Sequence, residues 1–341
     1  MSALEDIAAR ALEDADAERA RRKRFQRDWR RQFRVRRFAG PLVHERQLDH
    51  LRIAHVTDIH VGRVTPFEAQ MEAVRLVNEG KPDAVMITGD FVCHSTLHLD
   101  QLQEIIGGYE APVFAVLGNH DHWSGADEVR WGLQRAGAEV LDNVHTTITL
   151  RHQQLQVLGL DDAYTGHGKW REATKGLRDD LPTIGLSHIA EEADALWTKG
   201  VPLVLSGHTH AGQITIAKLH ELAVGKLAGH RYVHGLYGSR APKPDENVGA
   251  VYVGAGVGAA VVPLRIGERS RREVTFFELG HSAGSFLEPH EEQPALPGRK
   301  PSEKTKQRRQ QAVAKKRAKR EKKKARSKGK PSADPADVTA E

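Results

Sequence analysis

The sequence is poor in cysteine and aromatic residues and has no long apolar run. Its 341 residues include one cysteine, Cys93, which excludes an internal disulfide and any zinc site built on several cysteines. No apolar stretch approaches the roughly 18 residues that a membrane-spanning helix needs. The first 18 residues include six Asp or Glu, unlike a secretory signal. We therefore expect a cytoplasmic protein.

The positive charge of the chain is confined to its two ends. Residues 19–37 hold 11 basic residues and one acidic residue, and residues 299–330 hold 17 basic and two acidic residues. The rest of the chain has 23 basic residues against 42 acidic ones. The pI of about 9.3 therefore describes the end segments, and the middle of the chain is acidic.

The basic N-terminal segment has the pattern of an amphipathic helix, which we predict over residues 1–38. Phe25, Trp29 and Phe33 recur every four residues and are ringed by the arginines of residues 19–37. Such a helix is typical of contact with an anionic membrane surface. This contact would place the protein at the inner face of the cell membrane. The alternative is that the aromatic side chains pack on the protein's own core while the arginines stay in solvent.

Residues 39–280 have the pattern of a folded domain of the α/β class. The first half alternates apolar strands with amphipathic helices, which predicts a parallel sheet covered by helices. The second half is richer in strands and suggests a second sheet packed on the first. The predicted strands are 51–56, 84–88, 112–117, 140–142, 147–150, 155–158, 183–186, 203–205, 213–216, 250–253 and 274–279, and the predicted helices are 67–78, 99–106 and 127–136.

The C-terminal segment, residues 281–341, loses this periodicity. It is polar with scattered proline, and the Lys/Arg run of residues 299–330 follows. By composition we predict a disordered tail. Residues 299–330 would bind nucleic acid or acidic lipid with little sequence specificity, or remain solvated without a partner.

Five short stretches share one design, in which an apolar strand is followed by residues able to bind a metal ion. Parallel strands end at the same edge of a sheet, and α/β proteins place their sites there. Carboxylate, amide and imidazole ligands without a thiolate suit Mn, Fe or Zn better than Ca or Mg. The candidate ligands are Asp58, His60, Asp90, Asn119, His188, His208 and His210.

The stretch Gly118-Asn119-His120-Asp121 directly follows one of these strands. Gly118 lets the backbone turn closely. Asn119 offers an amide oxygen and His120 an imidazole. Asp121 can accept from that imidazole and fix its tautomer. The stretch therefore aims several polar groups at one point.

The motifs together resemble the calcineurin-like metallophosphoesterase family. The matching series is Asp58-x-His60, Gly89-Asp90, Gly118-Asn119-His120-Asp121, His188 and Gly207-His208-x-His210. Three longer phrases resemble its bacterial branch of membrane-associated phosphodiesterases. They are Gly159–Asp162, Ser206–Gln213 and Tyr252–Gly256, and the resemblance covers residues 41–279.

The resemblance implies two packed mixed β-sheets flanked by helices, a calcineurin-like phosphoesterase sandwich with two divalent metal ions (Mn, Fe or Zn). Asp58, His60 and His210 would hold the first metal, and Asn119, His188 and His208 the second, with Asp90 bridging. A metal-bound hydroxide would attack the phosphoester, and His120, oriented by Asp121, would act as the acid.

The substrate is not fixed by these motifs. We expect a phosphodiesterase or phosphatase acting on a phospholipid or another membrane-associated phosphoester. The alternatives are a nuclease, a cyclic-nucleotide phosphodiesterase, and a polyanion-binding scaffold without catalysis. After His188 the branch usually shows Asn-Pro-Asp, whereas Ile189-Ala-Glu stands here, so substrate choice is open.

Several further residues have both a functional and a structural interpretation. The glycines of residues 254–258 resemble a dinucleotide fingerprint, but no helix pattern follows, which favours close backbone packing. Cys93 has the pattern of a buried structural thiol. Side chains that could line the pocket or simply occupy loops or turns are His94, His98, His122, His167, Asp161 and Asp162.

Overall fold

The computed structural model describes residues 29–212, 229–239, 249–259, 265, 270–281, 293, 295–296 and 302–328. Two six-stranded mixed sheets form the centre of the fold. In spatial order the first sheet contains β1 (Phe33–Ala39), β12 (Arg272–Leu279), β2 (Leu51–Val56), β3 (Ala84–Thr88), β4 (Val113–Val116) and β5 (Glu139–Val140). The second contains β10 (Gly235–Gly238), β11 (Ala250–Val253), β9 (Leu203–Ser206), β8 (Thr183–Ser187), β7 (Gln153–Leu160) and β6 (Val144–Leu150).

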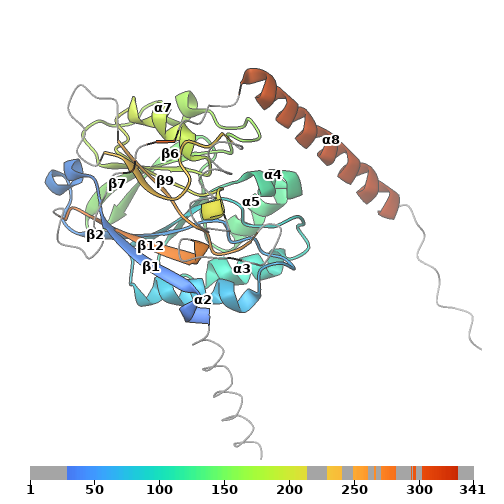
Figure 1. The fold of residues 1–341 in the computed structure, drawn as a ribbon, viewed down its shortest axis with the longest axis horizontal. Coiled ribbons are helices and arrows are strands. Elements are labelled where there is room, and N and C mark those ends of the chain that lie inside the picture. The colour runs from blue at the N-terminus through green and yellow to red at the C-terminus, as the bar shows by residue number, and fades with distance from the viewer. Residues whose placement is uncertain are drawn as a thin grey trace, which may run out of the picture.

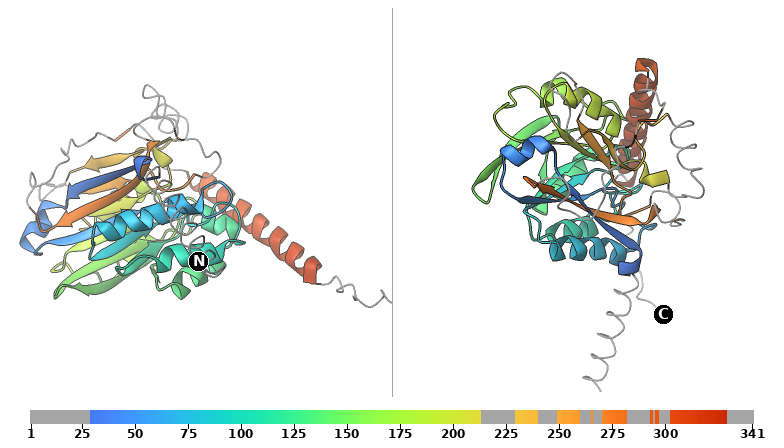
Figure 2. Two further views of the ribbon diagram at one scale, coloured as in Figure 1. Left: turned by 90° about the horizontal axis from the view of Figure 1, so that it is seen from below. Right: turned by 60° about the vertical axis from the view of Figure 1, so that its left-hand side comes forward.

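The two sheets pack face to face, and helices cover their outer faces (Figures 1 and 2). Side chains from both sheets, such as Ile53 and Leu205, form the apolar layer between them. The outer face of the first sheet packs against α2 (Phe67–Glu79), α3 (Leu99–Gly107) and α5 (Ala126–Arg135). The second packs against α6 (Trp170–Ala173) and α7 (Ala193–Trp197). The predicted sandwich of two mixed sheets flanked by helices is confirmed.

Most predicted elements of the central domain are present within one to three residues of their predicted ends. The predicted helix 67–78, for example, is α2, which begins after Pro66 and buries Ala69, Ala73, Val74 and Val77 against the sheet. The short elements were not predicted: β10, α4 (Asn119–Ser124), α6, α7 and the 3-10 helices η1 (Leu42–Arg46), η2 (Ala190–Glu192) and η3 (His210–Gly212). The predicted strand 213–216 lies outside the described residues.

The predicted N-terminal helix is wrong for residues 33–38, which form the edge strand β1. This strand pairs in parallel with β12 along its whole length, so its backbone groups are bonded in the sheet. Phe33 and Phe38 are buried in the core. The Arg36 guanidinium lies 4.6 Å from the centre of the Phe38 ring. The alternative that the aromatic residues pack on the core therefore holds for Phe33, and residues 1–28 lie outside the described part.

The predicted disorder of the C-terminal segment is wrong for residues 303–328, which form the 26-residue helix α8 (Glu303–Lys328). The reason is local: the segment contains Ala, Gln, Lys and Arg, which favour helix, and has no Pro or Gly. Figures 1 and 2 show α8 beside α4 and extending away from the sheets. Within the described residues, no helix has the length and apolar character needed to cross a membrane.

Candidate metal centre

The loops that carry the candidate ligands meet at one edge of the sandwich. They follow β2, β3 and β4 in the first sheet and β8 and β9 in the second, and within each sheet these strands are parallel. Backbone hydrogen bonds join the loops of the first sheet. The amide of Asp58 donates to the carbonyl of Gly89 at 3.0 Å, and that of His60 donates to the carbonyl of Asp90 at 2.9 Å. The strand-end placement predicted from the sequence is what the structure contains.

Five candidate ligands have a left-handed backbone. Their φ angles are +52° for Asp58, +50° for His60, +55° for Asp90, +75° for His208 and +51° for His210. For a residue with a Cβ atom this conformation costs on the order of 1 kcal/mol or more. Such strain persists where the surrounding structure holds the backbone in place. The left-handed conformation turns these side chains toward a common point.

Asp58, His60, Asp90 and His210 form the first group, with one ligand atom of each within 4.8 Å of the others. The Nε2 atom of His60 lies 2.9 Å from Nε2 of His210 and 3.6 Å from Oδ2 of Asp90. Oδ1 of Asp58 lies 3.3 Å from Nε2 of His210. All four side chains are buried, so bulk water cannot solvate these oxygen and nitrogen atoms.

Asp90, His188 and His208 form the second group, within the same 4.8 Å limit. Nε2 of His188 lies 3.4 Å from Oδ2 of Asp90 and 3.2 Å from the amide oxygen of Asn119. Nδ1 of His188 donates to the carbonyl of Thr88 at 2.7 Å, which leaves Nε2 as the nitrogen that faces the centre. Asp90 therefore belongs to both groups.

Burial and nearby charge set the protonation of the four histidines. Burial lowers the pKa of His60 and His210 to about 3, although Asp90 and Asp58 act in the opposite direction. Burial, reinforced by the charge on His188, holds the pKa of His208 well below its usual value. Burial also disfavours the charged form of His188, but Asp90 outweighs it and raises the pKa to about 10. Three histidines are thus neutral ligands at pH 7, and binding through Nε2 of His188 requires loss of its proton.

The arrangement fits divalent metal ions. Oδ1 of Asp58 is buried and has no hydrogen-bond donor among the described residues. A bare carboxylate oxygen in such a place is costly unless a cation compensates it. Imidazole nitrogens and carboxylate oxygens surround the same point without a thiolate, which is a donor set for Mn, Fe or Zn. The cluster can therefore hold metal ions, and its chemistry does not select among these three.

His120 lies beside both groups, but its orienting partner differs from the predicted one. Its ring centre lies 4.9 Å from that of His60. Nδ1 of His120 donates to the carbonyl of Cys93 at 2.5 Å. The carboxylate of Asp121 instead accepts from the amides of Val92 at 3.1 Å and Gly118 at 2.9 Å. The prediction that Asp121 fixes the His120 ring is wrong, because both carboxylate oxygens are used to hold the loop.

Two glycine positions show how closely the backbone packs at the site. A Cβ atom at Gly118 would lie 2.3 Å from Oδ1 of Asp90. One at Gly256 would lie 2.8 Å from Cβ of Asp58. The glycine-rich stretch 254–258 thus packs against the Asp58 loop, in agreement with the structural interpretation of that motif.

Of the remaining candidate histidines, His94 lies beside the site, His122 lies in α4, and His98 and His167 lie outside helices and strands. The His94 ring lies 5.2 Å from that of His120. His122 donates to Asp161 at 2.7 Å and stacks on His167 at 4.1 Å. His98 precedes α3, and its side chain does not cap the helix.

Cys93 and Asp162 have structural roles. The Cys93 thiol is buried, and burial raises its pKa to about 11. The carboxylate of Asp162 accepts from the amides of Tyr164 at 3.2 Å and Thr165 at 2.7 Å, so it caps the turn that carries Tyr164.

Sequence reasoning missed four residues near the centre. The Thr57 hydroxyl lies 2.9 Å from Oδ2 of Asp58. The Arg265 side chain is half-buried and lies 3.5 Å from Nδ1 of His210. Trp123 and Tyr164 place aromatic rings near His120 and His208. Thr57 and Trp123 adjoin recognised motifs and could have been found, whereas nothing in the sequence indicates Arg265.

Comparison with known proteins agrees with this geometry. Residues 51–212 match the family model described as calcineurin-like phosphoesterase. Phosphodiesterase YaeI of Escherichia coli (strain K12) is 30% identical over 236 residues, covering 67% of this chain and 82% of that protein. The uncharacterized metallophosphoesterase YkuE of Bacillus subtilis (strain 168) is 28% identical over 237 residues, covering 68% and 79%. A transmembrane protein with metallophosphoesterase domain from Danio rerio is 32% identical over 240 residues, covering 65% and 52%.

Fold, site and relatives together define a metal-dependent hydrolase of phosphoric esters. The chain belongs to the calcineurin-like phosphoesterase family, whose members use two divalent metal ions, and its Asp/His cluster is able to hold them.

Proposed function

We propose that this chain hydrolyses phosphodiesters at a two-metal centre. The observation that carries the proposal is the shared position of Asp90, whose Oδ2 lies 3.6 Å from Nε2 of His60 and 3.4 Å from Nε2 of His188. One carboxylate oxygen between two groups of ligands is the arrangement that a pair of cations needs. The choice of a diester over a monoester follows the name of the Escherichia coli relative.

Each half of the centre has its own set of proposed metal ligands. When bound, two divalent ions supply activation of a water molecule and neutralisation of the phosphoryl oxygens. Asp58, His60 and His210 would hold the first ion and Asn119, His188 and His208 the second, and Asp90 would be shared between them.

His120 is the proposed general acid. Its Nδ1 is engaged by the Cys93 carbonyl, so Nε2 is the nitrogen left for proton transfer. As an imidazolium it donates that proton to the departing oxygen of the diester. The backbone amide of His120 also donates to Oδ1 of Asp90 at 2.8 Å, which fixes the acid relative to the shared carboxylate. Asp121 acts indirectly, as a positioning residue that holds the loop.

A phospholipid substrate remains a prediction, and the structure removes part of the helix on which that prediction rested. It depended on a basic amphipathic helix over residues 19–37. Residues 33–37 are part of β1, and Arg36 and Arg37 lie over rings of the domain at 4.6 Å and 5.8 Å. Peripheral membrane attachment now depends on residues 19–31 alone, most of which lie outside the described part.

The proposed function is tested by metal removal and return with bis(4-nitrophenyl) phosphate as substrate. Protein treated with a chelator and dialysed should lose hydrolysis and regain it with Mn²⁺, with metal analysis approaching two ions per chain. Full activity in metal-free protein contradicts the proposal. A polyanion-binding scaffold predicts no hydrolysis under any metal condition, so the same measurement separates the two classes.

A further inference from the structure

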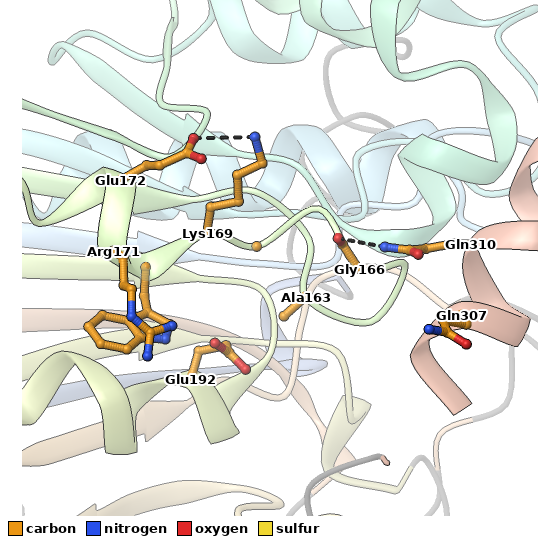
Figure 3. A pocket seen from close by; sticks show the side chains of 10 residues that line it. Ala163, Gly166, Lys169, Arg171, Glu172, Glu192, Gln307 and Gln310 are labelled. Carbon is orange, nitrogen blue, oxygen red and sulfur yellow. Dashed lines mark hydrogen bonds and ion pairs between the residues drawn. The ribbon is translucent and has the colours of Figure 1, made fainter. Parts of the chain in front are cut away.

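Helix α8 lies against the rim of the metal centre. The Arg309 guanidinium lies 3.6 Å from the centre of the Tyr164 ring. The side-chain amide of Gln310 donates to the carbonyl of Gly166 at 3.0 Å, as Figure 3 shows. α8 also contacts α4, the helix that begins with Asn119 and contains His120. The basic C-terminal helix is therefore docked beside the proposed general acid.

A run of aromatic rings leads from α8 to the candidate ligands. The Tyr164 ring centre lies 5.3 Å from that of His208 and 5.9 Å from that of Trp123. Trp123 in turn lies 4.9 Å from His120. Trp123 and Tyr164 are both half-buried, so each has an accessible portion. The site rim thus offers flat aromatic surface next to the point where a phosphoester would bind.

A cavity extends this surface between α6, the 163–168 loop and α8 (Figure 3). Its volume is about 460 Å³, and its charged lining residues are Lys169, Arg171, Glu172 and Glu192. The Arg171 guanidinium lies 4.3 Å from the centre of the Trp170 ring. Two carboxylates balance the two cations of its walls, and Lys169 is paired with Glu172 at 3.3 Å, so the cavity adds the Trp170 ring to the rim without adding net positive charge.

The charge and length of α8 indicate a polymeric anion. Its 26 residues include 14 Lys or Arg and two Glu. At 1.5 Å per residue the helix is about 39 Å long, far longer than a mononucleotide. Arg308, Lys315 and Lys319 are exposed. Their spacing puts them on one flank, about 100° around the helix from the line of Arg309.

The same helix lacks the features of a membrane-surface helix. Such helices carry Trp, Phe or Leu on an apolar face. The apolar side chains of α8 are alanines and Val313, none larger than valine. Basic charge with neighbouring aromatic rings is instead the combination by which proteins bind single-stranded nucleic acid, since rings stack on bases and cations follow the phosphates.

We propose that the phosphodiester cleaved at this centre is that of single-stranded nucleic acid, with its backbone along α8 and a base against Trp123 or on the Arg309 guanidinium that covers Tyr164. The proposal rests on the proposed phosphodiesterase function and names its substrate class. Arg309 connects the basic helix α8 with the aromatic rim of the site, because it belongs to the helix and its planar cation lies on the Tyr164 ring.

The first test uses the metal-loaded full chain with 5′-labelled 20-nucleotide single-stranded RNA and DNA. Wild type should bind and cleave them, with affinity falling steeply as salt rises. In Lys315→Gln/Lys319→Gln, the slope of log affinity against log salt should decrease in magnitude by about 1.4, or 0.7 for each phosphate that the variant no longer neutralises. The matched control is Arg46→Gln/Lys81→Gln, which removes two exposed cations at the opposite edge of the sheets and should leave the slope unchanged.

The second test separates stacking from charge. Wild type and Tyr164→Phe should prefer a normal oligonucleotide to one of the same length with abasic residues by roughly tenfold. Tyr164→Ala should lose this preference while retaining the salt dependence. Equal preference in all three proteins would remove Tyr164 from the binding surface and overturn that part of the proposal.

The outcomes also distinguish failure of this inference from failure of the proposed function. Hydrolysis of bis(4-nitrophenyl) phosphate without oligonucleotide cleavage would overturn only the nucleic-acid substrate. Binding to phosphatidylglycerol vesicles with no oligonucleotide binding would assign α8 to a lipid surface instead. If neither the diester nor the oligonucleotide is hydrolysed, the proposed function itself fails.

Discussion

Buried carboxylates at the two edges of the β-sandwich differ in their hydrogen-bond donors. At the edge where β2 begins, Glu278 is fully buried and accepts hydrogen bonds from Nε of Arg52 at 2.8 Å and from His50. At the edge where β2 ends, Asp58 is equally buried, yet its Oδ1 has no donor among the described residues. A carboxylate whose two oxygens both have donors supports the fold, whereas Asp58, with donors on Oδ2 alone, leaves Oδ1 for a cation.

The backbone shows the same contrast. Asp58, His60 and Asp90 all have a left-handed conformation at the carboxyl edge. The segment before β2 contains the short helix η1, whose bonds such as that from Leu48 to the His44 carbonyl at 2.9 Å are ordinary. Lys81, Arg151 and His152 are left-handed at the amino edge, but the left-handed residues at the carboxyl edge are candidate ligands. Mutations at the two edges should separate activity from stability.

Asp90→Asn should give the largest effect. Loss of the shared charge weakens both halves of the centre, so we expect kcat/KM for bis(4-nitrophenyl) phosphate to fall by more than about 10³-fold and bound metal to fall below two per chain. Asp49→Asn, an exposed carboxylate at the opposite edge, is the matched control and should change neither value. Retained metal and activity in Asp90→Asn would show that the two halves do not depend on this residue.

His120→Ala should lower turnover by about 10²- to 10⁴-fold while metal content stays near two, because the residue donates a proton and does not hold an ion. The loss should be smaller for a nitrophenolate leaving group than for an alkoxide, which needs the proton more. Loss of one metal ion would instead identify His120 as a ligand.

Paired substitutions should change stability in opposite directions at the two edges. In chelator-treated protein, Glu278→Gln should lower the free energy of unfolding by about 3 kcal/mol, because Arg52 and His50 lose a buried partner. Asp58→Asn should raise it by about 1 kcal/mol, because the buried charge on an oxygen without a donor among the described residues is removed. Urea denaturation measures both, and destabilisation of the same size in each would contradict the comparison.

A smaller effect is expected from pH at the amino edge. Burial lowers the pKa of His44 from 6.5 to about 4. Between these values the unfolded chain takes up a proton that the folded protein does not, so this stability is present above pH 6.5 and is lost as the pH falls toward 4.

Between pH 6.5 and 5, wild type should therefore lose about 2 kcal/mol more than His44→Gln, at 1.36 kcal/mol per pH unit. Urea denaturation of metal-free protein at the two pH values measures the difference. Parallel losses in both proteins would show that His44 is not the group responsible.

The core of the fold and the site could be predicted because their patterns are local. A buried strand followed by Asp or His is visible in the sequence around Asp58, Asp90 and His188. Two parallel sheet segments then bring such strand ends together. The left-handed backbone could not be predicted, because Asp and His, unlike Gly, mostly adopt negative φ angles.

The errors occurred where tertiary contacts decide the outcome. Phe33 continued a four-residue spacing that favours helix, but pairing with β12 and burial of Phe38 favoured a strand. The proximity of Asp121 to His120 in sequence suggested contact, whereas the Cys93 carbonyl, 27 residues earlier, is the partner. Composition suggested disorder for residues 303–328, although helix propensity was present in the same residues.

The left-handed backbone at the metal centre also matters for engineering. A programme that raises thermal stability by relieving strained conformations would choose glycine or asparagine for Asp58, His60, Asp90, His208 and His210. Each such substitution would alter or remove a candidate ligand. Thermostable variants of this chain should therefore be sought with these five positions held fixed. Stability would then be gained elsewhere in the chain without loss of the candidate ligands.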